Sequence, residues 1–477
     1  MQQNVSILEK AFDPESFREL GHQLIDQLAD FVLAGQNRSA EQVIPYSAPN
    51  ALYEKWDQAE GSVWEKVLQH SIRLHHPRYL GHQIATPPPI GALAGLLADT
   101  INNGMGVYEM GMAGTVIERK LVEWLGQKMN LGTEVSGFLT SGGSLGNLTA
   151  LLAARQAATD TDIWTEGQAG QKPFAVLVSE EAHYCVDRAV KIMGWGENGI
   201  VKVPTDNAYR MRPESLPEAL AEAKKRGRHV VAVIASACST ATGSFDDIDK
   251  IADFCAENGI WLHVDAAHGG GIVFSKKYRR LLKGIGRADS VVMDFHKMAL
   301  SPALSTALLF RRPQSGYSTF AQKASYLWES EGDAEWFNLA RRTFECTKHM
   351  MGLRVYVLKE MFGDQLFAAF IDQVMDLGKV FADLIHHKPD FDLLLSPACN
   401  IVCFRYAPGT SEDHNQLNAD IRQRLVESGR FYIVQTEIKG QRFLRVSIMN
   451  PFSTKSDLEA LLQEVEKIGQ KLIQAEH

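Results

Sequence analysis

Between residues 135 and 312, short apolar runs alternate with segments of helical periodicity. The runs occupy residues 174–178, 230–235, 261–266, 290–293 and 307–310. Strands that alternate with helices are typical of βαβ units, in which helices cover both faces of a mostly parallel sheet. The pattern therefore predicts an α/β fold. Between two of the runs it also predicts a helix that Asp246 caps and Gly259 ends.

The two ends of the chain have different patterns. Asp13 and Pro14 form a typical helix start, and the helix carries an apolar stripe that suits packing on its own chain or on a second subunit. After a helical stretch, strands are expected at residues 401–406, 432–436 and 443–448. We therefore expect an N-terminal helical segment (1–75), a large domain (76–355) and a small C-terminal α+β domain (356–477).

The composition narrows the class of protein. The chain has 477 residues, 45% of them hydrophobic, and its net charge of −8 comes without a basic stripe, which argues against nucleic acid as a partner. The six cysteines are scattered, as expected in a reducing compartment. Because no apolar run approaches the ~18 residues of a membrane span and the start does not resemble a signal peptide, we expect a cytoplasmic protein without a membrane partner.

Two polar motifs follow apolar runs. Residues 140–147 read TSGGSLGN and open a helical pattern, so this turn is a candidate phosphate cradle, although such turns are also common without a ligand. Asp265 lies near the end of the run 261–266, at the edge where open α/β sheets bind ligands. Three interpretations stay open for Asp265: a loop cap, a metal ligand with His263 and His268, or the partner of a protonated pyridine nitrogen.

Lys297 follows the next apolar run, in the sequence Asp294-Phe295-His296-Lys297. Most lysines are surface residues, but a desolvated lysine can act as a Schiff-base nucleophile. The order along the chain is a glycine-rich turn, an aspartate at one strand end and a lysine at the next. This order makes Lys297 a candidate for covalent attachment of a cofactor.

With Ser179-Glu180-Glu181-Ala182-His183, these motifs resemble the group II pyridoxal-phosphate-dependent amino-acid decarboxylases. Members of that family act on aromatic amino acids, glutamate, cysteine sulfinate or diaminobutyrate. The similarity extends from about His76 to Pro451. It implies fold type I with a mostly parallel seven-stranded sheet, pyridoxal 5'-phosphate (PLP) as the cofactor, no metal, and a carboxy-lyase that converts an L-amino acid to its amine and CO₂.

The resemblance also assigns roles to residues. Lys297 matches the lysine that holds PLP as a Schiff base, and Asp265 matches the carboxylate that keeps the pyridine nitrogen protonated, so that the cofactor acts as an electron sink. His183 matches the histidine stacked on the ring. The other matched cofactor contacts are Gly143 and Ser144 in the phosphate turn, Thr240, Ala267 beneath the ring, and His296.

Tyr326 matches the tyrosine that protonates the substrate carbon after CO₂ leaves; related aldehyde synthases have phenylalanine there. Arg445 matches the arginine that meets the substrate carboxylate in glutamate-type members, although it could instead bridge the two domains. Gln83 matches members with acidic substrates, His82 occupies a position that is aromatic in the aromatic-amino-acid enzymes, and Asp294 matches diaminobutyrate-type sequences. Acidic, aromatic and diaminobutyrate substrates therefore all stay open.

Two other classes compete with a decarboxylase. An aminotransferase or a Cα–Cβ lyase shares the cofactor cradle, but Tyr326 and the His296-Lys297 pair count against it. A catalytically silent regulator is disfavoured because all four matched catalytic residues are present. Family members build each active site between two subunits. The resemblance therefore implies a homodimer, with helix 13–34 in the interface and loop 315–333 reaching across it.

Overall fold

The computed structural model describes residues 6–58, 60–317, 319–320, 336–409 and 413–476. A seven-stranded sheet has the order β1-β7-β6-β5-β4-β2-β3, in which only β7 runs opposite to the others. Its strands are β1 (Ser136–Thr140), β2 (Phe174–Ser179), β3 (Ile200–Val203), β4 (His229–Ser236), β5 (Trp261–Asp265), β6 (Ser290–Asp294) and β7 (Thr306–Phe310). The predicted α/β fold with a mostly parallel seven-stranded sheet is confirmed.

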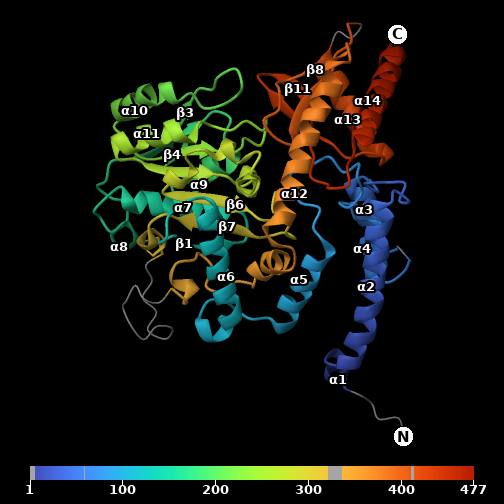
Figure 1. Ribbon diagram of the computed structural model, residues 1–477, viewed down its shortest axis with the longest axis horizontal. Helices are drawn as coiled ribbons and strands as arrows, with labels where there is room; N and C mark the ends of the chain where they lie inside the picture. The colour runs from blue at the N-terminus through green and yellow to red at the C-terminus, as the bar shows by residue number, and fades with distance from the viewer. Residues whose placement is uncertain (1–5, 59, 318, 321–335, 410–412, 477) are drawn as a thin grey trace.

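Helices cover both faces of this sheet (Figure 1). Val176 and Val178 of β2 pack with α7 (Gly143–Ala157) and α9 (Tyr184–Ile192) on one face. The alternate residues Ala175 and Leu177 belong to the main core on the other face, with α10 (Leu216–Lys225) and α11 (Ile248–Asn258). Because side chains alternate between faces, a strand covered on both sides is apolar throughout, which explains the continuous apolar runs in the sequence.

The start of α11 corrects one sequence prediction. Asp247, not Asp246, caps this helix through its side chain. Asp246 is buried and accepts hydrogen bonds of 2.7 Å from the backbone N–H groups of Met211 and Ser236, and burial raises its pKa to about 6. The carboxylate of Asp246 thus links β4 to the segment before α10, and Asp247 caps the helix instead. Gly259 ends the helix in the left-handed conformation, as predicted.

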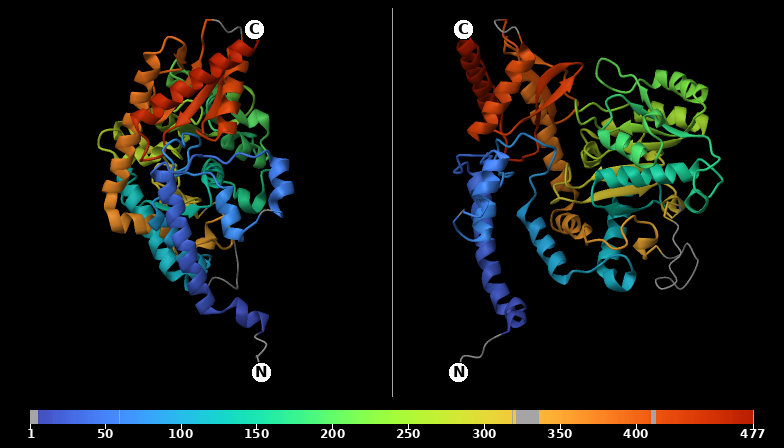
Figure 2. Two further views of the ribbon diagram at one scale, coloured as in Figure 1. Left: turned by 90° about the vertical axis from the view of Figure 1, so that its right-hand side faces the viewer. Right: turned by 180° about the vertical axis from the view of Figure 1, so that it is seen from behind.

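A second sheet, with the order β10-β11-β9-β8, lies in the C-terminal part and is antiparallel throughout. Its strands are β8 (Phe391–Leu393), β9 (Ile401–Tyr406), β10 (Val434–Ile438) and β11 (Gln441–Ser447). Figures 1 and 2 show the long helix α12 (Gly352–His386) between the two sheets, and α13 (His414–Ser428) and α14 (Lys455–Glu476) beside the smaller one. Residue 356 lies inside α12, so the division into three domains stays a proposal.

The N-terminal part is helical. Its helices and those before β1 are α1 (Ile7–Ala11), α2 (Pro14–Gln36), α3 (Pro49–Trp56), α4 (Val63–Gln69), α5 (Pro89–Ile101) and α6 (Tyr108–Lys128), and the short α8 (Ile163–Glu166) follows α7. Asp13 caps α2 and Pro14 is its first residue, as predicted. The apolar stripe of α2 is exposed in the single chain; Phe17 is 56% exposed. No helix in the described part of the chain has the length and apolar composition needed to cross a membrane.

Candidate active site

The C-terminal ends of the parallel strands surround a cavity of about 430 Å³ in the large domain. This volume falls within the range of small-molecule sites. All the cofactor contacts expected from the sequence line it: Gly143, Ser144, His183, Thr240, Asp265, Ala267, His296 and Lys297. The structure thus brings together residues that lie up to 154 positions apart, because each one lies at or after the end of a strand of the same sheet.

Lys297 is held by an ion pair at the floor of this cavity. Its Nζ atom lies 2.9 Å from Oδ2 of Asp294, the last residue of β6, and its side chain is 21% exposed. The other oxygen of Asp294 accepts a 2.5 Å hydrogen bond from the hydroxyl of Thr306, on the neighbouring strand β7. Nε2 of His296 lies 3.6 Å from Oδ2. Asp294 therefore organises the lysine, a role that its sequence position alone did not reveal.

The ion pair sets the charge of both partners. Burial alone would raise the pKa of Asp294, but the charges of Lys297 and His296 outweigh it and hold that pKa below its usual value. Burial likewise opposes the charge of Lys297, but Asp294 outweighs it and raises the pKa of the amine. A raised pKa leaves less neutral amine at any given pH, and only the neutral amine attacks an aldehyde.

We therefore expect Asp294→Asn to load PLP about tenfold faster than the wild type at pH 7 to 8, because the amine loses the charge that favours its protonated form. Loading is measured by mixing the cofactor-free protein with PLP and following the Schiff-base absorbance. Asp253→Asn, at a 62% exposed side chain on α11, is the matched control and should load at the wild-type rate. Equal rates for wild type and Asp294→Asn would contradict the role of the ion pair.

The predicted phosphate turn lies at the start of α7. Gly142 has a φ of 141° and precedes the first helical residue, Gly143, so free N–H groups of the first turn face the cavity. A methyl group added at Gly143 would lie 3.1 Å from Oδ1 of Asp294, so the turn packs directly against that carboxylate. The close approach accounts for glycine at this position.

Asp265 and His183 line the cavity from two other strands. Asp265 ends β5 and is 9% exposed, and its Oδ1 accepts a 3.1 Å hydrogen bond from the N–H of Ala267. His183 caps α9, and its Nδ1 accepts from the N–H of Cys185 at 3.3 Å. Burial lowers the pKa of His183, although Asp265 acts in the opposite sense. The imidazole therefore presents a neutral, flat surface, which suits stacking on an aromatic ring.

The three predicted substrate residues lie outside the residues that line this cavity but are linked to it. The guanidinium of Arg445, on β11, donates to the carbonyl oxygen of Thr240. The N–H of Ala85 donates to the carbonyl of His296 at 2.9 Å, which places the segment with His82 and Gln83 beside the lysine. Arg445 is only 7% exposed and Gln83 only 9%.

Several cavity residues were not predicted, Asn147, Cys185, Ser236 and Cys238 among them, and His268 was considered only as a metal ligand. Asn147 belongs to the quoted glycine-rich motif, and its place one helical turn after Gly143 is the signal that could have identified it. Both ring nitrogens of His263 are hydrogen-bonded, to Asn147 and Ser290, so the metal-ligand interpretation of His263 is wrong. Tyr326 lies outside the described residues, and its role stays a prediction.

A lysine and a carboxylate at adjacent strand ends, beneath a glycine-rich helix start on a mostly parallel sheet, define a PLP-dependent enzyme of fold type I. Residues 40–407 match the family model described as "Pyridoxal-dependent decarboxylase conserved domain". The chain belongs to this family and is a PLP-dependent amino-acid decarboxylase, a carboxy-lyase.

Relatives of this chain have different substrates in their names. It is 26% identical to the aromatic-L-amino-acid decarboxylase of Bacillus atrophaeus, over 96% of each chain. It is 28% identical to the L-2,4-diaminobutyrate decarboxylase of Acinetobacter baumannii, over 84% of this chain and 81% of that protein. The crystal structure of mouse CSAD matches with a TM-score of 0.89 and 25% identity, over 96% of this chain and 99% of the mouse chain. These matches agree on the reaction and leave the substrate open.

The cavity fits PLP. Lys297, the one lysine among the described residues that line it, suits the aldehyde. The start of α7 suits the phosphate, and the carboxylate of Asp265 suits a protonated ring nitrogen. When bound, PLP supplies the electron sink for the charge that remains when CO₂ leaves. The carboxylate of Asp294 beside the turn keeps Thr306 and His296 as neighbours when Lys297 is bound to the cofactor, which makes it compatible with a nearby phosphate.

Proposed function

We propose that this protein decarboxylates an L-amino acid with an acidic side chain, of the glutamate, aspartate or cysteine sulfinate type. The observation that supports this substrate class is a group of basic side chains without acidic partners among the described residues. Arg445 and His82 belong to segments that contact cavity residues, and the charge of Arg422 acts on His82. Neither arginine forms an ion pair with any residue that the structure describes. Buried charges are normally paired, so an anionic substrate would supply the missing partner.

The electrostatic environment of this group favours anions. Burial lowers the pKa of Arg445, and no carboxylate among the described residues acts in the opposite sense. Its Nε atom is buried and has no hydrogen-bond partner among the described residues, and the same holds for Nε of Arg422. Partial burial, and then Arg445 and Arg422, lower the pKa of His82. A dianionic amino acid can therefore place one carboxylate on Arg445 and its acidic side chain near Arg422 and His82.

The residues of the cavity have the following proposed roles. Lys297 binds the cofactor covalently and is displaced by the substrate amine, and Asp265 holds the proton on the pyridine nitrogen. His183 covers one face of the ring, and Arg445 orients the carboxylate that leaves as CO₂. The remaining proposed cofactor contacts are Gly143, Ser144, Thr240, Ala267 and His296.

A diaminobutyrate substrate has one supporting observation, the identity of Asp294. A cationic side chain would need an accessible carboxylate, whereas Asp294 is 2% exposed and already contacts Thr306 and His296. Among the described residues that line the cavity, the other carboxylate is Asp265, which is assigned to the ring nitrogen. The acidic class is therefore preferred.

The test is to incubate the PLP-loaded protein with glutamate, aspartate, cysteine sulfinate, diaminobutyrate, tyrosine, DOPA and tryptophan, and to measure CO₂ and amine together. Equal amounts of CO₂ and amine from an acidic member support the proposal. Turnover of diaminobutyrate or of an aromatic member alone would refute the substrate class and leave the reaction unchanged. Arg422→Gln should raise KM for the acidic substrate more than it lowers kcat, since it touches the substrate only.

Tyr326→Phe tests the proposed proton donor. Without the phenol the substrate carbon is protonated poorly after CO₂ leaves, and the proton goes to the cofactor carbon instead. Hydrolysis then releases an aldehyde and leaves the amino group on the cofactor, so we expect the variant to bind PLP normally and to yield less amine and more aldehyde. Amine and aldehyde are quantified against CO₂ in the same reaction. Unchanged amine yield would remove the role assigned to Tyr326.

We further propose a homodimer in which α2 lies in the interface. Exposed apolar side chains along α2 and α5 support it, because such surfaces are normally covered. They include Phe17, Leu20, Ile25, Leu28, Leu93, Leu96, Leu97 and Ile101. Light scattering of the active enzyme should give twice the mass of the chain, and an active monomer would contradict the proposal.

A further inference from the structure

A chain of buried hydrogen bonds crosses the large sheet behind the cofactor cavity. His263, in the middle of β5, is fully buried. Its Nε2 atom lies 2.7 Å from Oδ1 of Asn147, and its Nδ1 atom lies 2.8 Å from Oγ of Ser290 on β6. The indole Nε1–H of Trp261 donates to the same hydroxyl at 2.8 Å. The chain links β5, β6 and the first turn of α7.

The protons in this chain have one consistent arrangement. The amide nitrogen of Asn147 donates to the carbonyl oxygen of Gly143 at 2.9 Å, so the amide oxygen of Asn147 must face His263. Nε2 of His263 must then carry the hydrogen. Burial lowers the pKa of His263 to about 4, so the ring is neutral at pH 7 and its Nδ1 accepts the hydroxyl hydrogen of Ser290. Trp261, which can only donate, completes a chain in which every group donates toward Gly143.

Asn147 joins the elements that carry the proposed cofactor contacts. Its side chain binds the carbonyl of Gly143 in the phosphate turn, and its second amide hydrogen points to Sγ of Cys185 at 3.6 Å, two residues after His183. Through His263 it is joined to β5, two residues before Asp265. Through Ser290 it is joined to β6, which ends at Asp294.

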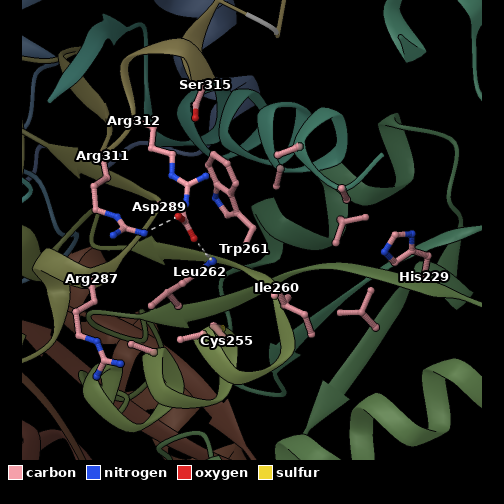
Figure 3. Close-up of a pocket in the computed structure, with 18 residues that line it drawn as sticks. His229, Cys255, Ile260, Trp261, Leu262, Arg287, Asp289, Arg311, Arg312 and Ser315 are labelled. Carbon is pink, nitrogen blue, oxygen red and sulfur yellow. Dashed lines mark hydrogen bonds and ion pairs between the residues drawn. The ribbon is translucent and has the colours of Figure 1, made fainter. Parts of the chain in front are cut away.

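The Trp261 end of this chain of hydrogen bonds lies at the amino-terminal ends of β5 and β6, opposite the cofactor cavity. Trp261 and Asp289 line a second cavity there, of about 580 Å³ (Figure 3). Asp289 accepts from the N–H of Leu262 at 2.9 Å and is paired with Arg311 at 2.9 Å, as the dashed lines in Figure 3 mark. β5 is thus held to the start of β6 through Leu262 and the indole of Trp261, next to His263.

We propose that His263 is a positioning residue for the cofactor: its Nε2–H tautomer holds Asn147, and Asn147 sets the distance between the phosphate turn at Gly143 and the strand that carries Asp265. The inference rests on the proposed placement of the PLP phosphate at this turn. His263 itself touches neither cofactor nor substrate. Its effect should therefore be on affinity for the phosphate group rather than on the chemical step.

Replacing His263 by glutamine or by asparagine separates the roles of its two ring nitrogens. Glutamine is long enough to place an NH₂ group near the position of Nε2, whereas the amide of asparagine reaches only to the position of Nδ1. We expect His263→Asn to bind PLP about tenfold more weakly than the wild type, the effect of one buried hydrogen bond left unmade. His263→Gln should stay within about threefold of the wild type, because it still donates to Asn147.

The measurement is equilibrium titration of the cofactor-free protein with PLP and, separately, with pyridoxal, which lacks the phosphate. The loss in His263→Asn should appear with PLP and not with pyridoxal, a difference that general damage to the fold would not produce. Asn147→Ala should show the same phosphate-specific loss. The double variant with His263→Asn and Asn147→Ala should bind PLP no more weakly than Asn147→Ala alone, because both substitutions act through one contact. Thermal unfolding of each cofactor-free variant provides the stability control.

Ser290→Ala is the matched control on the other side of the ring, because it leaves the donor to Asn147 in place and should keep PLP affinity within about threefold. If His263→Asn does not fold, the contrast between Ser290→Ala and Asn147→Ala decides the question. The proposal would be overturned if the losses of PLP affinity in His263→Asn and Asn147→Ala added up in the double variant, or if affinity for PLP and for pyridoxal fell equally. Equal losses of PLP affinity in Ser290→Ala and Asn147→Ala would also overturn it. A wild type that binds PLP but turns over no acidic amino acid would refute the proposed substrate class alone.

Discussion

Lys297→Ala is expected to abolish decarboxylation, with kcat lower by at least about 10⁴-fold, the scale of losing a covalent catalytic group. Lys297 is the one lysine among the described residues that line the cavity, and the cavity holds it against Asp294 at 2.9 Å. Within the described part of the chain, no other amine lines the cavity to substitute for it. The variant should also lack the Schiff-base absorbance of the loaded wild type while keeping some PLP through the phosphate turn.

The attachment site can be identified directly. Reduction of the loaded wild type with borohydride, digestion and mass spectrometry should place the cofactor on the peptide that contains Lys297. Lys276→Ala, at an exposed lysine of the same domain, is the control and should retain full activity and labelling at Lys297. Labelling of another lysine, or turnover by Lys297→Ala, would show that this assignment is wrong.

The second large effect is expected from Asp265→Asn, which should lower kcat by about 10³-fold with PLP still bound, since a charge that stabilises the transition state is removed. The amide preserves the shape at the end of β5 and can still accept from the N–H of Ala267, but it no longer favours a proton on the pyridine nitrogen. The electron sink is weakened, whereas the covalent link and the phosphate contacts are unchanged.

A cofactor analogue tests the reason for the loss. PLP with a methyl group on the ring nitrogen carries a permanent positive charge, so it should narrow the difference in kcat between Asp265→Asn and the wild type. Aspartate and asparagine have nearly the same volume, so an effect of packing would persist with the analogue. A loss of the same size with both cofactors would contradict the assigned role of Asp265.

Much of the site could be predicted because its residues follow local patterns. Each apolar run in the large domain forms a strand, and Asp265, His183 and Lys297 lie at or shortly after the ends of such strands. They therefore meet at the carboxyl edge of one sheet. The start of α2 at Asp13 and Pro14 depends only on neighbouring residues and was also predicted. By contrast, the strand expected at 432–436 is found at Val434–Ile438, since strand ends depend on the pairing partner, here β11.

The α/β class, the order of the motifs along the chain and the expected cofactor contacts can all be read from local sequence patterns, because strand periodicity and helix caps are encoded within a few residues. The partners of the polar side chains, by contrast, depend on the folded arrangement of the whole chain. This arrangement paired Asp294 with Lys297, used Asp246 as a buried acceptor instead of a cap, and joined His263 to Asn147 across 116 positions. Such partners are chosen by the requirement that buried polar groups be satisfied, and the groups that satisfy them meet only when the chain has folded.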